Sequence, residues 1–235
     1  MGNRHQYSSN KTATITVLYL ALLPVFTSAI AEDSQQLQKS HPSKSSEKPE
    51  RIAPSSRKMV EKHTDDLRLA MLSLYRLNPQ ELQKSASVSP EEMVQWVFEG
   101  PFGWKFDALR EAQGISALEM AFSLDFHGDR ILALITGMQT MIISAYGGKT
   151  EFLFSEPADP QRLYISARNT DIVRWKLIQA NSGLRIEGPE IQEIESILIS
   201  IKQRLESDAK AHARKSAQAL IPAPSTIESA AFLPF

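Results

Sequence analysis

The sequence predicts an all-α protein: a single helical bundle-like domain of about six helices around a buried, apolar central helix. Three observations lead to this prediction. Apolar residues recur three and four positions apart in several segments, and helix-start motifs precede most of these segments. The one strand-like segment, residues 149–154, is too short to found a sheet by itself. We expect the helical domain to span residues 58–218.

An apolar face and three start motifs place the helices of the first half. One face of the first helix carries five apolar residues at helical spacing: Val60, Leu67, Met71, Leu74 and Tyr75. Two further helices are expected after Asn78-Pro79 and Ser89-Pro90, where a capping residue precedes a proline and a glutamate follows in the first turn. Ser116 and Glu119 have capping-box spacing and predict a third start.

Residues 130–149 form the most apolar stretch in the second half of the chain, with no charge between Arg130 and Lys149. Asp129 can cap this helix and Gly147-Gly148 can end it, which leaves about 17 residues, or roughly 25 Å. Because a bilayer core is about 30 Å thick, we interpret the stretch as a core helix. A membrane-associated hairpin through 131–146 and a ligand-lining wall are the alternatives. Small residues that allow a second helix to approach closely line one face: Ala133, Gly137, Thr140 and Ser144.

Two long helices are expected in the last third of the chain. Asp159-Pro160 starts the first, and Gly188-Pro189 starts the second. The last helix carries a heptad-like apolar seam formed by Ile191, Ile194, Leu198, Ile201 and Leu205. A seam of this kind can pair with a second copy, so self-association through residues 191–205 is a prediction.

The two ends of the chain differ from the domain between them. Residues 1–31 have the features of a signal peptide: a basic start, an apolar run and a small-residue cleavage site that ends at Ala31. The chain has no cysteine, which fits a bacterial periplasm, so we expect cleavage after Ala31 and export to that compartment. Residues 32–57 are poor in apolar side chains and predict a flexible, disordered tether. The proline-containing residues 219–235 predict a frayed, disordered tail.

Charge and motif content exclude several classes of function. Lysine and arginine number 26 and the acidic residues 27, for a net charge of −1. Such a chain lacks the basic footprint of a nucleic-acid-binding protein, so we exclude nucleic acid as a partner. The sequence contains no phosphate-cradling glycine loop, dinucleotide fingerprint or Gly-x-Ser-x-Gly motif, and no cofactor is predicted.

Asp125-Phe126-His127-Gly128-Asp129 is the sharpest chemical motif. Its Asp-x-His-x-Asp pattern places three metal-ligating side chains, Asp125, His127 and Asp129, within five residues. Zinc or another divalent metal could use these groups. The alternative is a loop that ends one helix and in which Asp129 caps the next.

Two other segments are candidate interaction sites. Five large aromatic rings in eleven residues could line a pocket or grip a partner, or they could anchor a loop in the core: Trp96, Phe98, Phe102, Trp104 and Phe106. The second candidate is a polar group on or near one side of a helix, made of Arg168, Asn169, Asp171 and Arg174, with Trp175 close by. This group could be a surface ion-pair ladder or a buried cluster that faces the small residues of 130–146.

The segments MQTMIISAYGGKTEF and ARNTDIVRWKL resemble exported, mainly helical proteins of Gram-negative bacteria, a family without assigned activity. The resemblance implies an exported helical protein and carries over no catalytic or binding residue. We therefore expect a non-catalytic binding or interaction module of the bacterial envelope, with an envelope protein or membrane component as partner. The alternatives are an envelope enzyme or metal-binding protein that uses Asp125, His127 and Asp129, and a membrane-associated protein.

Overall fold

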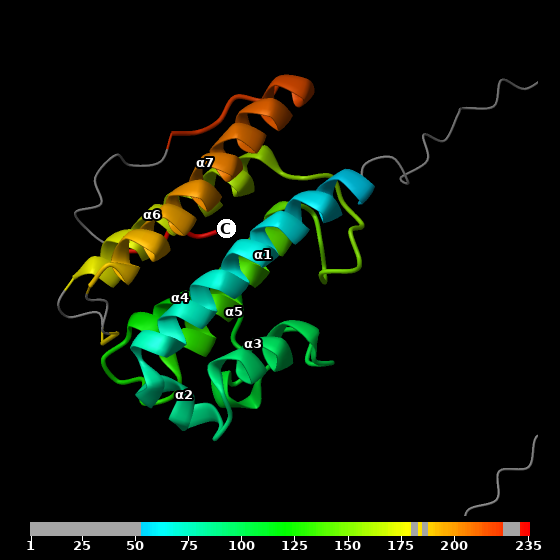
Figure 1. Cartoon of the computed structure of the whole chain (residues 1–235). Coiled ribbons are helices and arrows are strands. Elements are labelled where there is room, and N and C mark those ends of the chain that lie inside the picture. Colours follow the sequence, from blue (N-terminus) through cyan, green and yellow to red (C-terminus); the bar gives the residue numbers. More distant parts are fainter. Residues whose placement is uncertain (1–52, 180–182, 185–187, 223–230) are drawn as a thin grey trace, which may run out of the picture. The chain divides into compact units, whose positions relative to one another are not determined.

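The computed structural model describes residues 53–179, 183–184, 188–222 and 231–235, and this part of the chain is all-helical (Figure 1). The expected signal peptide, 1–31, lies outside the described residues. The seven α-helices of the described part, together with one short 3₁₀ turn, are α1 (Ala53–Leu77), α2 (Pro79–Ser85), α3 (Pro90–Glu99), η2 (Asp107–Leu109), α4 (Gly114–Phe122), α5 (Arg130–Ala145), α6 (Pro160–Ile178) and α7 (Glu190–Ser216). The strand-like segment forms an isolated bridge between Gly148 and Phe154.

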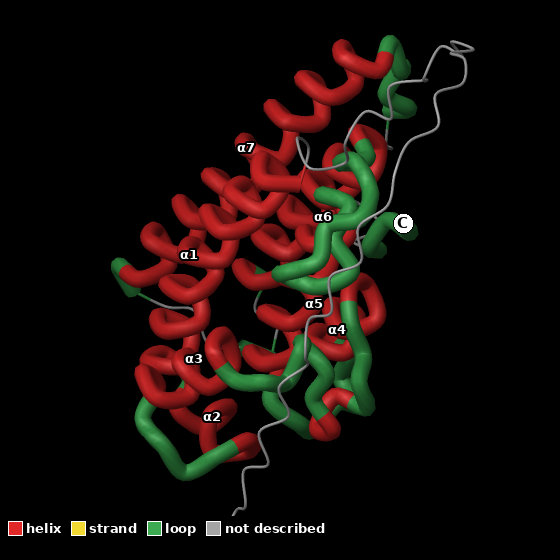
Figure 2. Tube along the Cα trace, turned by 90° about the vertical axis from the view of Figure 1, so that its right-hand side faces the viewer, coloured by secondary structure: helices red, strands yellow, loops and turns green. Residues whose placement is uncertain are grey.

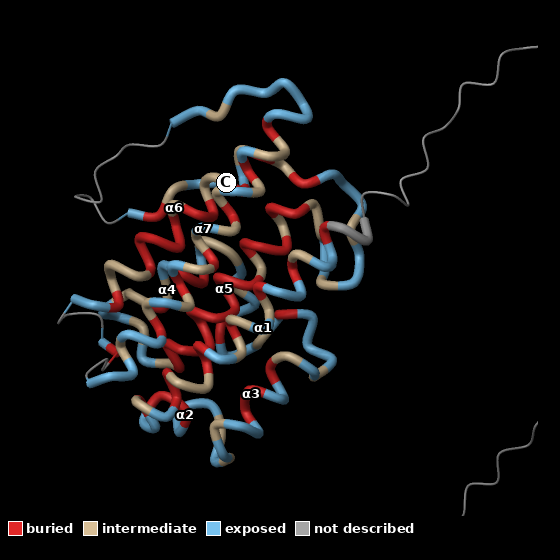
Figure 3. Tube along the Cα trace, turned by 45° about the horizontal axis from the view of Figure 1, so that its top comes forward, coloured by how far each residue is buried: buried red, intermediate tan, exposed pale blue. Residues whose placement is uncertain are grey.

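Helix α5 is the centre of the domain, as its apolar sequence predicts. Fourteen of its sixteen residues are buried, and Figure 3 shows this burial along α5 and on the inward sides of its neighbours. Asp129 caps the helix and Gly147 follows it with a positive φ of 80°, so both expected end signals are confirmed. Among the described helices, none combines the length and apolar character that a membrane crossing requires.

The small residues of α5 allow α4 to approach closely. A Cβ atom at Gly137 would lie 2.8 Å from the Leu118 side chain and 2.9 Å from the Gly114 carbonyl oxygen. Thr140 Oγ1 accepts a hydrogen bond of 2.7 Å from the Gly114 N–H, which otherwise has no partner in the first turn of α4. Helix α4 begins at Gly114, so the capping box expected at Ser116 lies inside the helix instead of at its start.

The apolar seam of α7 is an intramolecular interface. Ile194, Leu198, Ile201 and Leu205 are buried, and α7 packs against α6 and α1. These four residues are used within the chain, and self-association through residues 191–205 stays a prediction. Figure 2 shows α2 and α3 together at one end of the helical domain, away from the last turns of α7.

Both expected ends of the domain need correction. Helix α1 begins at Ala53, so residues 53–57, assigned to the tether, are helical. Residues 231–235, assigned to the frayed tail, pack on the helices, and Phe232 is buried. Burial of one aromatic ring stabilises the contact by about 2 kcal/mol, which explains how so short a segment is held.

Candidate functional site

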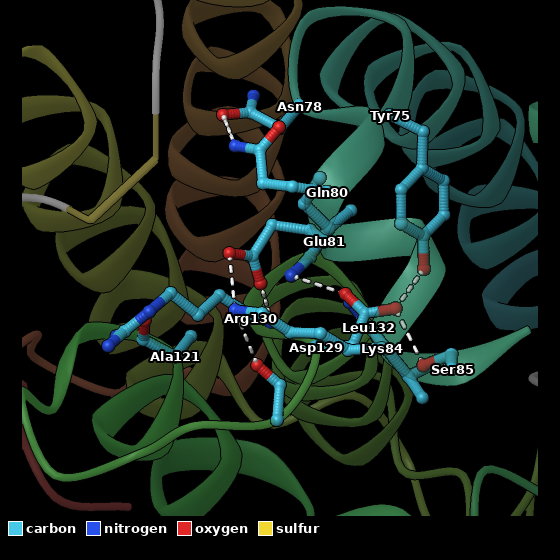
Figure 4. A network of polar contacts seen from close by, with 12 residues as sticks. Tyr75, Asn78, Gln80, Glu81, Lys84, Ser85, Ala121, Asp129, Arg130 and Leu132 are labelled. Carbon is cyan, nitrogen blue, oxygen red and sulfur yellow. Dashed lines mark hydrogen bonds and ion pairs between the residues drawn. The ribbon is translucent and has the colours of Figure 1, made fainter.

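The Asp125–Asp129 motif places one carboxylate in a buried network (Figure 4). Asp129 accepts hydrogen bonds from the backbone N–H groups of Ile131 (3.0 Å) and Leu132 (2.9 Å) at the start of α5. Its second oxygen accepts from Tyr75 Oη at 2.7 Å and Ser85 Oγ at 2.8 Å. Burial raises the pKa of the Asp129 carboxyl, and these hydrogen bonds oppose that rise. Asp129 therefore acts as a helix cap that joins α1, α2 and α5.

Glu81 and Arg130 extend the same network to α4. The Glu81 carboxylate accepts from the Arg130 backbone N–H at 2.8 Å and from Lys84 Nζ at 2.7 Å. The Arg130 guanidinium donates to the carbonyl oxygens of Ala121 (3.0 Å), in the last turn of α4, and of Ser123 (2.7 Å), its C-cap. These contacts satisfy buried backbone groups at the ends of two helices, so the network has a structural role.

The motif does not assemble a metal site. Asp125 and His127 are exposed, whereas Asp129 is buried and engaged in capping. Across the part of the chain that the structure describes, no three His, Cys, Asp or Glu side chains gather closely enough to hold a metal ion. The capping alternative is the one that the geometry supports.

The aromatic segment divides into buried and exposed rings. Trp104 is buried and meets Phe98 edge-on, with ring centroids 5.1 Å apart. Trp96 and Phe102 remain 45% and 46% exposed. Phe102 contacts Phe106, with ring centroids 5.3 Å apart, and Phe106 contacts Trp104. The rings therefore anchor the loop after α3, and Trp96 and Phe102 keep exposed area.

The polar group on α6 also divides. Asp171 pairs with Arg174 at 3.2 Å, with Arg168 at 3.7 Å and with Lys202 of α7 at 3.4 Å. This ion-pair network joins α6 to α7. The small residues of α5 pack against α4 instead, so the polar group on α6 does not face them. Trp175 is half-buried. The Asn169 side chain instead forms two hydrogen bonds with the backbone of Leu233.

The structure contains a cleft of about 700 Å³. The segments that line it lie at the end of the domain opposite α2 and α3 in Figure 1. Its walls are the first turn of α1, the α5–α6 connection, the first turn of α6 and the last turns of α7. Its lining residues are Ser56, Ser144, Gly147, Glu156, Pro157, Ala158, Asp159, Pro160, Arg162, His212, Lys215, Ser216 and Gln218. The volume lies in the range of small-molecule sites.

Three basic side chains, Arg162, Lys215 and His212, line the cleft. Arg162 lies 3.4 Å from Ser144 Oγ and 3.8 Å from the Asp159 carboxylate, and its guanidinium lies 5.9 Å from the centroid of the Phe235 ring. Asp159 is engaged in capping α6, where it accepts from the backbone N–H groups of Gln161 and Arg162. Lys215 has no ion pair within the described residues. The cleft therefore offers two cations with donor capacity for a ligand.

His212 is the third basic side chain of the cleft. Burial lowers its pKa, the Lys215 ammonium lowers it further, and Asp208 opposes both effects. The imidazole is therefore neutral near pH 7 and offers one donor and one acceptor. Ser216 Oγ donates to the His212 backbone carbonyl at 3.0 Å and so does not use the imidazole as a base.

A partly buried polar chain joins α1, the end of α5 and α7. Asp208, one turn before His212 on α7, accepts a hydrogen bond of 2.6 Å from Tyr146 Oη. His63 Nε2 lies 3.3 Å from the same hydroxyl, and His63 Nδ1 is buried without a hydrogen-bond partner in the described residues. Burial, with the charges of Arg204 and Lys62, lowers the pKa of His63 to about 3. Tyr146 is the C-cap of α5 and precedes Gly147, which lines the cleft.

The cleft residues carry no local signal in the sequence. Ser144, Arg162 and His212 belong to three helices, and each is an ordinary polar residue in its own segment. Only the tertiary packing of α5, α6 and α7 brings them together. No known protein family, curated protein or solved structure matches this chain.

Proposed function

We propose that this protein is an exported, non-catalytic binding module of the bacterial envelope that holds a small anionic ligand in the cleft between α1, α6 and α7. The observation that carries this proposal is the placement of Arg162 and Lys215, with the neutral imidazole of His212, around one cleft of small-molecule size. Carboxylate and phosphate groups are the natural partners of such a set.

The chemistry of the cleft favours binding over catalysis. Two of its serine hydroxyls are engaged elsewhere, because Ser216 donates to a backbone carbonyl and Ser144 receives a long contact from Arg162. Its one imidazole has no carboxylate hydrogen-bond partner in the described residues to orient it. These features support a site that holds an anion without transforming it.

Removal of both cations is expected to weaken anion binding. In the double variant Arg162→Ala and Lys215→Ala, the affinity for inorganic phosphate and for citrate should fall at least tenfold, because each charge-assisted hydrogen bond contributes about 1.5–3 kcal/mol. Isothermal titration calorimetry measures this change. Arg214→Ala is the matched control, since Arg214 is exposed beside Lys215 and does not line the cleft. Equal affinities in all three proteins would contradict the proposal.

Export is tested separately. The signal features of residues 1–31 support cleavage after Ala31, so the protein recovered from the periplasmic fraction of a Gram-negative host should begin at Glu32. Amino-terminal sequencing of that fraction makes the measurement. Ala29→Arg together with Ala31→Arg should block processing, because small residues are required at the cleavage site. A full-length chain confined to the cytoplasm would contradict export and would not bear on anion binding in the cleft.

A further inference from the structure

The cleft carries a carboxylate in addition to its cations. Glu156 lines the cleft from the connection between α5 and α6, and it is exposed. Its carboxylate forms no ion pair and no hydrogen bond within the described residues. An unpaired carboxylate repels a simple anion such as phosphate, so a ligand that also carries a positive group is a better match for this cleft.

The backbone of Glu156 is fixed against the end of α5. Its N–H donates to the Gly147 carbonyl oxygen at 3.2 Å. Gly147 has a φ of 80°, and a Cβ atom at this position would collide with the Glu156 carbonyl oxygen. The connection therefore packs directly on the end of the helix, and only the side chain of Glu156 remains to be ordered when a ligand binds.

The charged groups of the cleft come from different segments and do not neutralise one another. Glu156 belongs to the α5–α6 connection, Arg162 to the first turn of α6 and Lys215 to the last turn of α7. None of these three forms an ion pair with another in the part of the chain that the structure describes. Asp159, the second carboxylate of the cleft, is engaged in capping α6. The charges left for a ligand are two positive and one negative.

Ser56 adds an uncharged polar group from a fourth segment. It lies near the start of α1 and lines the cleft, and it is only 4% exposed. Its hydroxyl forms no hydrogen bond with any described residue. Buried hydroxyls nearly always have a partner, because an unpaired one has lost its hydrogen bonds to water. The Ser56 hydroxyl can accept from an ammonium or donate to a carboxylate, so it supports a polar ligand in the cleft.

We propose that the ligand of the cleft is an amino acid with two carboxylates, which Arg162 and Lys215 bind, and with an ammonium group that pairs with Glu156. Such a molecule carries two negative charges and one positive charge, the set opposite to that of the cleft. The cleft volume of about 700 Å³ leaves room for it between the three groups. This inference rests on the proposed function, because it names the class of anion that the two cations bind.

The comparison of L-glutamate with glutarate tests the ammonium contact. Glutarate has the same carbon chain and both carboxylates, and it lacks only the amino group. The full chain should bind L-glutamate about tenfold more tightly than glutarate, because only L-glutamate can form a charge-assisted hydrogen bond with Glu156. Isothermal titration calorimetry measures both affinities.

Two glutamate substitutions assign the preference to one side chain. Glu156→Gln should lower the affinity for L-glutamate about tenfold and should not lower the affinity for glutarate, since it removes a charge that attracts only the ammonium. Glu119→Gln is the matched control and should change neither affinity, because Glu119 is an exposed residue of α4 that does not line the cleft. The double variant Arg162→Ala and Lys215→Ala should weaken the binding of both ligands.

The possible failures separate this inference from the proposed function. Equal affinities for L-glutamate and glutarate, both lost in the double variant, would overturn the inference and leave the anion cleft in place. Binding of phosphate without binding of L-glutamate would have the same meaning. Equal losses in Glu156→Gln and Glu119→Gln would show that the overall charge of the protein sets the affinity, which also overturns the inference. Absence of binding for all of these anions would contradict the proposed function as well.

Discussion

Asp129→Ala is expected to lower the free energy of unfolding by about 3 kcal/mol, through loss of the helix cap and of the partner of a buried hydroxyl. Asp129 satisfies two backbone N–H groups at the start of the central helix. It also accepts from Tyr75 Oη, which is fully buried and would be left without an acceptor. Urea unfolding followed by far-ultraviolet circular dichroism measures the change.

The neighbouring Asp125→Ala is the matched control for this substitution. Asp125 belongs to the same motif but is exposed, so its replacement should change the free energy of unfolding by less than about 0.5 kcal/mol. Asp129→Asn should lower the free energy of unfolding by an amount between these two values, because the amide keeps one acceptor oxygen for the cap. Equal effects of Asp125→Ala and Asp129→Ala would contradict the assignment of Asp129 as a buried cap and would reopen a joint role for the motif.

Acidification is expected to destabilise the fold through His63, by about 3 kcal/mol at about pH 4. Its pKa is lowered from 6.5 to about 3 by burial first, then by Arg204 and Lys62. Below pH 6.5 the unfolded chain binds a proton that the folded chain does not, so stability falls as the pH drops from 6.5 toward 3. Above pH 6.5 the residue is neutral in both states and contributes no pH dependence.

His63→Gln tests this assignment, because glutamine does not titrate. Its free energy of unfolding should fall less than that of the parent chain between about pH 7 and about pH 4, and the difference should be about 3 kcal/mol. Urea unfolding at a series of pH values provides both curves. His127→Gln is the control, since His127 is exposed. Parallel curves for the parent chain and His63→Gln would show that another group controls acid unfolding.

Local patterns were sufficient to predict the all-α class and the central helix. The cap at Asp129 and the burial of the α5 stretch follow from apolar content and end signals that lie next to one another in the chain. The seam of α7 was also found, and in the structure it packs within the chain. Periodicity shows that one face is buried and does not show whether α6 or a second copy buries it.

The candidate sites depend on contacts between distant segments and could not be found in this way. Arg162 and His212 meet only through the packing of α6 with α7. Phe232 lies in a proline-containing end that composition assigns to disorder, and only the position of Asn169 and Lys176 on α6 gives it a place to bind. The Asp-x-His-x-Asp pattern was misleading because a helix cap and a metal ligand use the same carboxylate.

Titration of the His212 imidazole by nuclear magnetic resonance, with and without inorganic phosphate, tests the anion cleft most directly. Without the anion, burial and Lys215 hold the pKa of His212 below its usual value of 6.5. A bound anion beside the ring favours the imidazolium, so phosphate should raise this pKa, and Lys215→Ala together with Arg162→Ala should abolish the rise. A His212 titration curve that saturating phosphate leaves unchanged would contradict the account.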